Sequence, residues 1–352
     1  MEDIFYMVLG IILAILGFGI IIFVHEFGHF IAARSFGVTV NEFAIGMGPK
    51  IFSWKKEGGT AFSLRLFPIG GFVSMAGEDE ESDDPNSFEK KSKFARFVIL
   101  FAGAFMNLLL GFIIMLVCVI SSDKLYSNKI ESFLVATPDG QIVEQYQGLM
   151  VGDEIKSVDG HKVNVRYDYI FTSMRLDGKP VTLTVKRDGK TEKIENFVFP
   201  TDVSEGVTFA NPSFFIPQPK EKNLFNCITE TFGQTTASVK MVLYSLFDLL
   251  AGKYSVDAVS GPVGVVSEIG ESSKYGLSSV LFLLGLIAIN IGVFNLLPFP
   301  ALDGGRIFFV LIEALIRRPI SKKLETAINF AGLAFLLSVM LIVTAKDIIT
   351  LF

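Results

Sequence analysis

Four long apolar stretches dominate the hydrophobic pattern of this chain. They run from Ile4 to Val24, from Phe97 to Ile120, from Val280 to Phe299 and from Ala327 to Val343. Because a helix needs about 20 apolar residues to cross a bilayer, each stretch predicts one membrane-spanning helix. The first stretch has no basic segment before it and no small-residue cleavage site after it. We therefore expect a retained helix there rather than a signal peptide.

The segment between the second and third stretches has a different pattern. Three short β-rich runs, Glu154–Val158, Val181–Lys186 and Ile194–Phe199, are punctuated by Asp-Gly turns, which predicts a small mixed α/β domain within residues 130–200. A short helix is expected at Tyr167–Leu176. Farther along, Thr235–Leu250 has an apolar stripe at helical spacing. This helix could lie on the membrane surface or pack against the small domain.

The composition agrees with a membrane protein and excludes several other classes. Hydrophobic residues make up 51% of the chain, 35 of them Phe, and charged residues only 19% against a usual value of about 25%. A soluble fold could not bury that much apolar surface. The net charge of -5 gives no basic surface for nucleic acid, and two cysteines are too few for a disulfide framework.

The distribution of Lys and Arg predicts the orientation of the spans, since cytoplasmic links are enriched in these residues. No Lys or Arg precedes the first span, whereas the links between spans one and two and between spans three and four are both basic. Their basic residues are Arg34, Lys50, Lys55, Lys56, Arg65, Lys90, Lys91, Lys93 and Arg96 in the first link, and Arg306, Arg317, Arg318, Lys322 and Lys323 in the second. We therefore expect both links in the cytoplasm, with both termini and residues 122–278 outside.

These patterns predict a polytopic α-helical membrane protein with four transmembrane helices and an inserted small α/β domain. Residues 1–121 should form the first two helices and their cytoplasmic link, and residues 122–205 the inserted domain. Residues 206–278 should form an extracytoplasmic linker with an amphipathic helix, and residues 279–352 the last two helices.

Two of the three histidines fall in the run His25-Glu26-Phe27-Gly28-His29, where the first span ends. On a helix, positions four apart share a face, so both imidazoles can reach one metal ion. Glu26 stands beside them as a candidate general base, which is the arrangement of zinc metalloproteases. The alternative is a pair of buried polar residues satisfied by packing. Ionisable groups within a span are costly and usually functional, so we favour a catalytic metal site.

A catalytic zinc ion takes three protein ligands, so one more ligand is needed. His161 is the remaining histidine, but it follows Asp159-Gly160 in the region expected outside the membrane. Asp303 is the better candidate, because Pro298 and Pro300 break the third span near its cytoplasmic end. Irregular backbone at that depth is tolerated only where it lines a cavity or is buried in protein. The predicted orientation places this carboxylate on the same side of the membrane as the two histidines.

The sequence resembles the site-2 protease family of intramembrane zinc metalloproteases, in its bacterial regulator-of-sigma-E protease branch. The resemblance covers nearly the whole chain and rests mainly on His-Glu-x-x-His at 25–29, Leu-Asp-Gly at 302–304 and Asn-x-x-Pro-x-Pro at 295–300. It implies Zn2+ as the cofactor, His25, His29 and Asp303 as its ligands, and Glu26 as the general base. It also links Asn295, with Pro298 and Pro300, to holding the substrate strand. Lesser matches are Gly46-Met47-Gly48-Pro49, Pro68-Ile69-Gly70-Gly71, Asn107 and Gly261-Pro262-Val263-Gly264.

A helical substrate must unwind before its peptide bonds can be cut, because its carbonyl groups are otherwise engaged. The segment Thr60–Met75 could help, since Ala61–Leu66 is β-like and a Pro-Ile-Gly-Gly turn follows it. We expect a short strand or hairpin there, with Ser63, Leu64 and Arg65 pairing with the substrate. An ordinary cytoplasmic hairpin fits the residues equally well. The resemblance implies a membrane-associated hairpin and favours the first interpretation.

The resemblance also implies that the inserted domain is a PDZ domain, a single one where better-known members of the branch have two. Gly152–Gly160 fits the family pattern Gly-Asp-x-Ile-x-x-Val-x-Gly. The preceding Ser-Pro-Ala-x-x-Ala-Gly-Leu pattern is degraded here to Gln141–Leu149. The chain thus departs from the family where a peptide-binding groove would be formed.

The expected activity is hydrolysis of peptide bonds within the transmembrane segments of single-pass membrane proteins, as in regulated intramembrane proteolysis. The resemblance implies substrates such as trimmed anti-sigma factors or remnant signal peptides, and an upstream site-1-type protease that acts first. It places the protein in the bacterial inner membrane, with the active site near the cytoplasmic side. Two rival classes are a catalytically weak scaffold that binds through its PDZ domain and a transporter. The intact Glu26 opposes the first, and the lack of repeated halves opposes the second.

Overall fold

The computed structural model describes residues 2–55, 59–78, 80–135, 143–176, 178–204, 207–252 and 260–350. The chain divides into two compact units. One comprises Met1–Ile114 with Tyr244–Phe352, and the other comprises Met115–Leu243. The Gln141–Leu149 segment lies partly outside the described residues.

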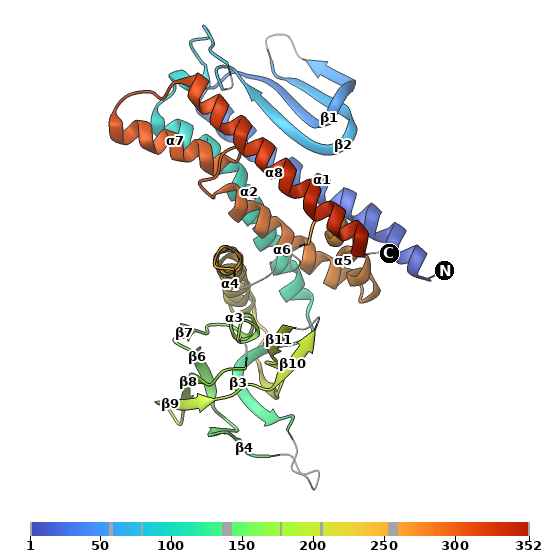
Figure 1. Ribbon diagram of the computed structural model, residues 1–352, viewed down its shortest axis with the longest axis vertical. Coiled ribbons are helices and arrows are strands. Elements are labelled where there is room, and N and C mark those ends of the chain that lie inside the picture. The colour runs from blue at the N-terminus through green and yellow to red at the C-terminus, as the bar shows by residue number, and fades with distance from the viewer. Residues whose placement is uncertain are drawn as a thin grey trace. The chain divides into compact units, whose positions relative to one another are not determined.

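Within the residues that the structure describes, four helices are long and apolar enough to cross a membrane, as the hydrophobic pattern predicts (Figure 1). They are α1 (Glu2–Ser35), α2 (Lys93–Ser121), α6 (Leu277–Asn295) and α8 (Lys322–Thr350). Helix α1 continues well past Val24, so the His-Glu-x-x-His run lies within one unbroken helix. Helix α6 ends four residues before the expected Phe299, because the prolines that follow cannot continue it.

Between α1 and α2 lies a long hairpin of β1 (Val40–Lys55) and β2 (Ala61–Met75). Both strands bend, at Gly46 and Gly48 in β1 and at Gly70 in β2, where all three glycines have φ of 85°. Because of the bends, the first half of β1 pairs with both halves of β2. The resulting order of segments is 71–75, 40–45, 61–64 and 50–55.

One core joins the hairpin to the helices around it. Phe43, Val73 and Met75 from the sheet pack with Ala33 of α1, and the full buried cluster is Ala32, Ala33, Val38, Val40, Phe43, Val73, Met75, Phe88, Ile99, Leu100, Ile307 and Val310. Burial of such side chains contributes about 1.5–3 kcal/mol each. The core includes residues of α2 and of α7 (Asp303–Ile316), and it therefore holds together the elements that carry the predicted site residues.

Helix α5 (Pro262–Lys274) begins at the Gly-Pro-Val-Gly match and packs against α1. A Cβ placed on Gly10 of α1 would lie 2.7 Å from the Cα of Gly270, so these two helices approach to backbone contact. The N-terminus of α5 is bound by Asp347 of α8, whose Oδ2 accepts hydrogen bonds from the N–H groups of Gly261 and Gly264 at 2.8 and 2.9 Å. The three helices are thus fastened together.

The second unit contains a sheet in the order β12-β3-β6-β8-β9, with β7 added beside β6. Its strands are β3 (Leu125–Phe133), β6 (Glu154–Val158), β7 (His161–Lys162), β8 (Val181–Arg187), β9 (Lys190–Phe197) and β12 (Phe215–Lys220), with short pairs β4 (Gln145–Tyr146) and β5 (Leu149–Met150), and β10 (Thr201–Ser204) and β11 (Val207–Ala210). The three predicted strands and the short helix, α3 (Arg166–Met174), are present. This small β-sheet region is compatible with an inserted domain.

The predicted boundary of that domain at residue 205 falls too early. Strand β12 pairs with β3, so residues well beyond 205 complete the sheet, and the compact unit continues to Leu243. Helix α4 (Leu224–Leu250) follows. A Cβ at Gly233 would clash with Val165, and Lys240 lies 3.5 Å from Asp168 of α3. This part of α4 therefore packs against the small domain. Of the two alternatives that the apolar stripe at 235–250 left open, this is the one in which the helix packs against the domain and does not lie on the membrane surface.

Candidate metal centre

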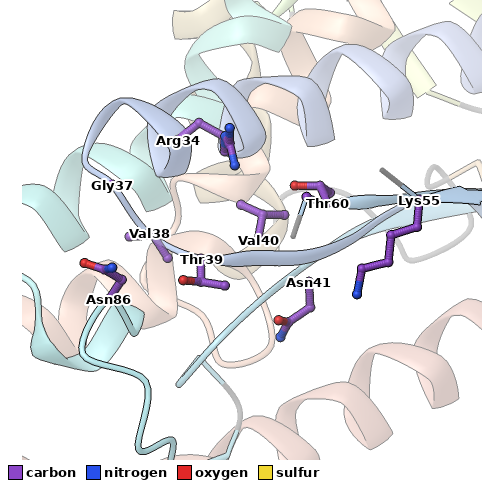
Figure 2. Close-up of a pocket in the computed structure, with 10 residues that line it drawn as sticks. Arg34, Gly37, Val38, Thr39, Val40, Asn41, Lys55, Thr60 and Asn86 are labelled. Carbon is purple, nitrogen blue, oxygen red and sulfur yellow. The ribbon is translucent and has the colours of Figure 1, made fainter. Parts of the chain in front are cut away.

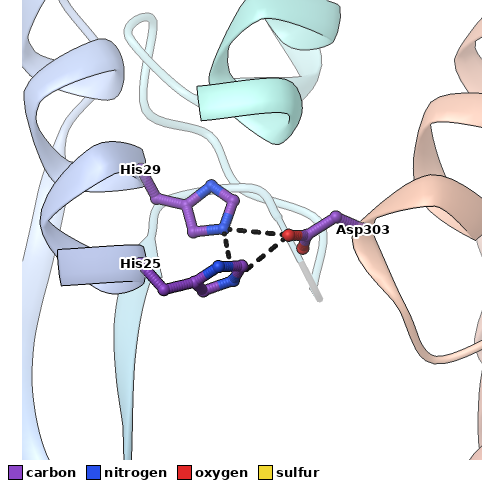
Figure 3. A group of neighbouring side chains, drawn as sticks. All are labelled: His25, His29 and Asp303. Atoms are coloured by element: carbon purple, nitrogen blue, oxygen red, sulfur yellow. Dashed lines mark hydrogen bonds and ion pairs between the residues drawn. The ribbon is translucent and has the colours of Figure 1, made fainter. Parts of the chain in front are cut away.

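His25, His29 and Asp303 come together although 274 residues separate the last two (303 minus 29). The Nε2 atoms of His25 and His29 lie 3.2 Å apart, and each lies 3.2 Å from Oδ2 of Asp303 (Figure 3). The two imidazoles project from consecutive turns of α1, and the carboxylate projects from the first turn of α7. Among the described residues, this is the group whose ligand atoms are close enough to share one metal ion.

The group has the geometry and the unsatisfied charge that a metal ion would require. Oδ2 of Asp303 is buried, and its polar neighbours among the described residues are the Nε2 atoms of the two histidines. In the tautomer that leaves Nε2 free for a metal these nitrogens carry no proton, so a cation is needed to satisfy the carboxylate oxygen. Ligand atoms about 2.0–2.1 Å from a tetrahedral zinc ion lie roughly 3.3 Å from one another. The three observed separations match one face of such a tetrahedron. Two imidazoles and one carboxylate are also a donor set that zinc accepts in catalytic sites.

Helix α2 fixes the ring of His29. Its Nδ1 lies 2.8 Å from the carbonyl oxygen of Ile99, so this nitrogen carries the proton and Nε2 is left for a metal. The two helices are very close here. A Cβ built on Gly103 would lie 2.2 Å from Nε2 of His29, and one built on Gly28 would lie 2.5 Å from the carbonyl oxygen of Ala102. Nothing in the sequence pattern singles out Ile99 or Gly103, because neither residue offers a side-chain ligand.

Asn107 orients the ring of His25. This side chain is fully buried in α2, with its amide nitrogen 3.3 Å from Nδ1 of His25, and its Oδ1 has no hydrogen-bond partner in the described part of the chain. When Nε2 binds a metal, Nδ1 carries the proton and needs an acceptor. Turning the amide over presents Oδ1 to Nδ1–H and satisfies both groups. The signal for this role in the sequence is an Asn within an otherwise apolar span, at a position that matches the family.

The loop between α6 and α7 sets the position of Asp303. Gly304 and Gly305 allow it to fold tightly, since a Cβ at Gly304 would lie 2.1 Å from the carbonyl oxygen of Leu297. Ala301 adopts φ of 71° and donates its N–H to Oδ1 of Asn329 on α8 at 3.1 Å. Helix α8 therefore supports the loop that presents the carboxylate.

Glu26 is not one of the converging ligands, but it lies between them and the hairpin. Its carboxylate accepts a hydrogen bond from the N–H of Val73, and a Cβ at Gly71 would lie 3.3 Å from its Cγ. The second half of β2 thus passes directly beside this residue.

The substrate-pairing residues expected in the hairpin need correction. Ser63 and Leu64 lie in a segment that pairs with 40–45 on one side and 50–55 on the other, so its backbone groups are already used. Ser63 and Arg65 instead bind Glu42, at 2.5 and 2.8 Å. The hairpin edge that borders Glu26 is the segment 71–75.

The three residues expected to hold the substrate in the α6–α7 region, Asn295, Pro298 and Pro300, differ in their exposure and in their contacts. Asn295 is the last residue of α6 and is half-buried, and Pro298 is exposed. Pro300 packs against α8, because a Cβ on Gly332 would lie 2.5 Å from its Cβ. This proline shapes the loop.

The polar face of the hairpin has its own charge network. Partial burial raises the pKa of Glu42, but hydrogen bonds from Ser63, Lys50 and Arg65 outweigh it and lower the pKa to about 2. Glu42 therefore remains ionised and ties three of the four segments together.

The sequence is similar to known zinc metalloproteases over nearly its whole length. Residues 13–339 match the model of peptidase family M50. The chain is 38% identical to a candidate zinc metalloprotease of Clostridium perfringens, over 96% of this chain and 98% of that one. It is 30% identical to the regulator of sigma-W protease RasP of Bacillus subtilis, over 97% and 99% of the two chains. The chain therefore belongs to peptidase family M50, the site-2 protease family, and is an integral-membrane zinc metalloprotease.

Proposed function

We propose that this protein hydrolyses peptide bonds within the transmembrane segments of other membrane proteins, with zinc held by His25, His29 and Asp303. The observation that carries the proposal is the convergence of these three ligand atoms at 3.2 Å, on helices that belong to a membrane domain. Zinc bound there would polarise the scissile carbonyl group and lower the pKa of the attacking water. We assign the protein to the regulator-of-sigma-E branch of the family.

In this proposal Glu26 acts as the general base. It is adjacent to both histidines but is not one of the three ligands, so its carboxylate is available to take a proton from water and return it to the leaving amine. Asn107 and the carbonyl of Ile99 hold the two imidazoles in the tautomer that leaves Nε2 for the metal.

The edge of β2 at 71–75 is the proposed site for the unwound substrate. The N–H of Val73 points at Glu26, so this edge faces the reaction centre. A substrate strand that pairs with it would have its backbone extended next to the base, through main-chain hydrogen bonds. We infer that Asn295 and the exposed Pro298, near the end of α6, contact the other side of this strand.

The small domain is proposed to be a single PDZ domain that restricts access rather than capturing peptides. Strand β3 pairs with β12 on one side and β6 on the other, so it offers no free edge among the residues that the structure describes. Prolines at 217 and 219 also remove donors from β12. These features support a filter against substrates with bulky ectodomains.

The proposed orientation has both termini and the small domain outside, in a bacterial inner membrane, and it rests on the Lys and Arg distribution. Labelling of single cysteines in intact cells tests it: Asp159→Cys should react from outside and Lys322→Cys should be protected. The reverse pattern would reject this orientation.

The proposed substrates are single-pass membrane proteins that another protease has first shortened. The relative from Bacillus subtilis is named a regulator of sigma-W protease, which supports an anti-sigma-factor-like protein as one substrate class. Remnant signal peptides are the other. Removal of residues 130–200 should then broaden cleavage to untrimmed substrates, and unchanged selectivity would argue against the filter.

The decisive experiment compares Glu26→Gln with the double variant His25→Ala/His29→Ala. Glu26→Gln should keep zinc, co-purify with uncut substrate and lose about 10²–10⁴-fold in rate, because glutamine cannot accept the proton. The double variant should lose nearly all zinc. Cleavage by Glu26→Gln at the wild-type rate, or zinc retained by the double variant, would refute the proposal.

A further inference from the structure

The edge of β2 at 71–75 continues into a loop that is bound to helix α7. Gly77 makes the turn into this loop: its φ is 72°, and a Cβ placed on it would lie 2.6 Å from the Cβ of Ser87. The next residue, Glu78, accepts a hydrogen bond from Nη1 of Arg306 on α7. The side chain of Glu78 is only 11% exposed, so this ion pair is largely withdrawn from solvent.

The two partners of this ion pair are both close in sequence to parts of the proposed site. Arg306 comes three residues after Asp303, the ligand in the first turn of α7. At 1.5 Å per residue these two residues are about 4.5 Å apart along the helix axis. Glu78 comes three residues after Met75, where β2 ends. The pair therefore joins the strand edge proposed to hold the substrate to the helix that carries a metal ligand.

Backbone hydrogen bonds hold the rest of the loop in place. The N–H of Ala76 donates to the carbonyl oxygen of Thr39 at 2.9 Å, and the N–H of Thr39 donates to the carbonyl oxygen of Asn86 at 3.1 Å. Thr39 and Asn86 also border the polar pocket where α1 turns into β1 (Figure 2). The N–H of Phe88 donates to the carbonyl oxygen of Ala76 at 2.7 Å. The loop thus has little slack between the end of β2 and Glu78.

Helix α8 supplies a second cation to the same loop. Lys322, its first residue, donates hydrogen bonds to the carbonyl oxygens of Gly77 and Glu80 at 2.9 and 3.1 Å. Its Nζ also lies 2.8 Å from Oε2 of Glu89. These contacts support the loop on both sides of Glu78, whereas Arg306 reaches the loop from α7 itself.

The separation between the strand edge and α7 matters for the proposed chemistry. A substrate strand paired with 71–75 takes its position from β2, whereas the metal ligands take theirs from α1 and α7. A displacement of about 1 Å between reacting groups can cost on the order of 10²-fold in rate. Val73 and Ile307 belong to one apolar core, but apolar contacts have no preferred direction. A charge-assisted hydrogen bond adds a defined geometry.

We propose that Arg306 and Glu78 are positioning residues for the cleavage reaction. Their ion pair fixes the edge of β2 against α7 and so sets the scissile bond of a paired substrate against the metal ligands. Neither side chain acts on the substrate directly, because the effect passes through the strand on one side and the helix on the other. The inference rests on the proposed function and adds to it the contact that keeps strand edge and metal centre at a fixed separation.

The first test separates kcat from KM for the full-length, zinc-loaded protein acting on a transmembrane substrate. Glu78→Gln removes the charge of the pair and keeps the shape of the side chain. We expect kcat to fall on the order of tenfold while KM changes less than about twofold, because main-chain pairing with 71–75 remains. Zinc content should be unchanged. Arg306→Gln should show the same split, whereas Arg306→Lys keeps a cation and should retain most of the rate.

The double variant Glu78→Gln/Arg306→Gln tests whether the two residues act through one another. If they do, it should be no slower than the slower single variant, because the link is already absent. Losses that multiply would show two independent effects and overturn the proposal. Glu271→Gln is the matched control: it removes the charge of an exposed ion pair with Lys274 within α5 and should leave kcat at the wild-type value.

Hydrogen exchange of backbone amides tests the same contact without cleavage. Exchange at Ala76 and Phe88, whose hydrogen bonds close the loop, should become severalfold faster in Glu78→Gln and stay unchanged in Glu271→Gln. Unchanged exchange in Glu78→Gln would overturn the proposal. A lower unfolding temperature with wild-type kcat would also overturn it, because that result identifies an ion pair that only stabilises the fold.

Cleavage by the wild-type protein and its loss in Glu26→Gln establish the proposed function first. A wild-type kcat in Glu78→Gln then counts against the positioning role alone. A wild-type protein that cleaves no transmembrane substrate would instead overturn the proposed function, and the positioning role with it.

Discussion

Replacement of Gly103 by alanine should remove zinc while leaving the fold intact. The added Cβ would lie 2.2 Å from Nε2 of His29 and 2.7 Å from its Cε1, whereas ordinary contact begins near 3.4 Å. The ring must therefore retreat by about 1.2 Å (3.4 minus 2.2). It cannot do so freely, because its Nδ1 is bonded to the carbonyl of Ile99 at 2.8 Å. A displacement of about 1 Å in a catalytic group can cost on the order of 10²-fold in rate.

The same substitution should not weaken helix α2 by itself. Alanine is favoured over glycine within a helix by about 1 kcal/mol, so thermal unfolding should be near or above the wild-type temperature. Gly19→Ala is the matched control, since a Cβ there meets no atom of the described residues within 4 Å. Zinc content by elemental analysis, unfolding temperature and cleavage of a transmembrane substrate are measured for both variants. Wild-type zinc and activity in Gly103→Ala would refute the close approach of α2 to His29.

Three further predictions concern other parts of the molecule. Asn107→Leu should weaken zinc binding about 10–100-fold by leaving Nδ1–H of His25 without an acceptor; chelator competition measures this, and unchanged affinity would contradict the positioning role. Glu42→Gln should lower the unfolding temperature at neutral pH. Because the folded pKa of Glu42 is about 2, below its ordinary value of 4.5, the stabilisation is complete above 4.5 and is lost as the pH falls towards 2. The difference between variant and wild type should therefore shrink over that range, and a constant difference would argue against the ion pairs. Asp347→Ala should speed the hydrogen exchange of backbone amides in 262–274, because the N–H groups of Gly261 and Gly264 lose their acceptor. The neighbouring control Lys346→Gln should leave the exchange rate unchanged. Equal amide protection in the two variants would show that the carboxylate of Asp347 does not hold α5.

Much of this molecule follows from local sequence pattern. The four spans can be read from runs of apolar residues because, without water, a helix is the form that satisfies its own backbone. His25 and His29 can be paired from sequence because a helix places residues four apart on one face. The strands of the small domain and α3 follow from alternation and from Asp-Gly turns. Each of these inferences needs only neighbouring residues.

Other features of the molecule arise from contacts between segments that are distant in the sequence, and these appear only in the tertiary structure. Residues 40–45 pair with both halves of β2, and for this reason the segment 71–75, and not Ser63 to Arg65, borders Glu26. The alternation of polar and apolar residues cannot reveal that one strand segment pairs on both sides. The extension of the small domain to β12 depends on a pairing across 82 residues, from Phe133 to Phe215. Gly103 matters only because α2 crosses α1 at His29. A glycine has no side chain to signal such an approach, so its role appears only once the two helices are packed together.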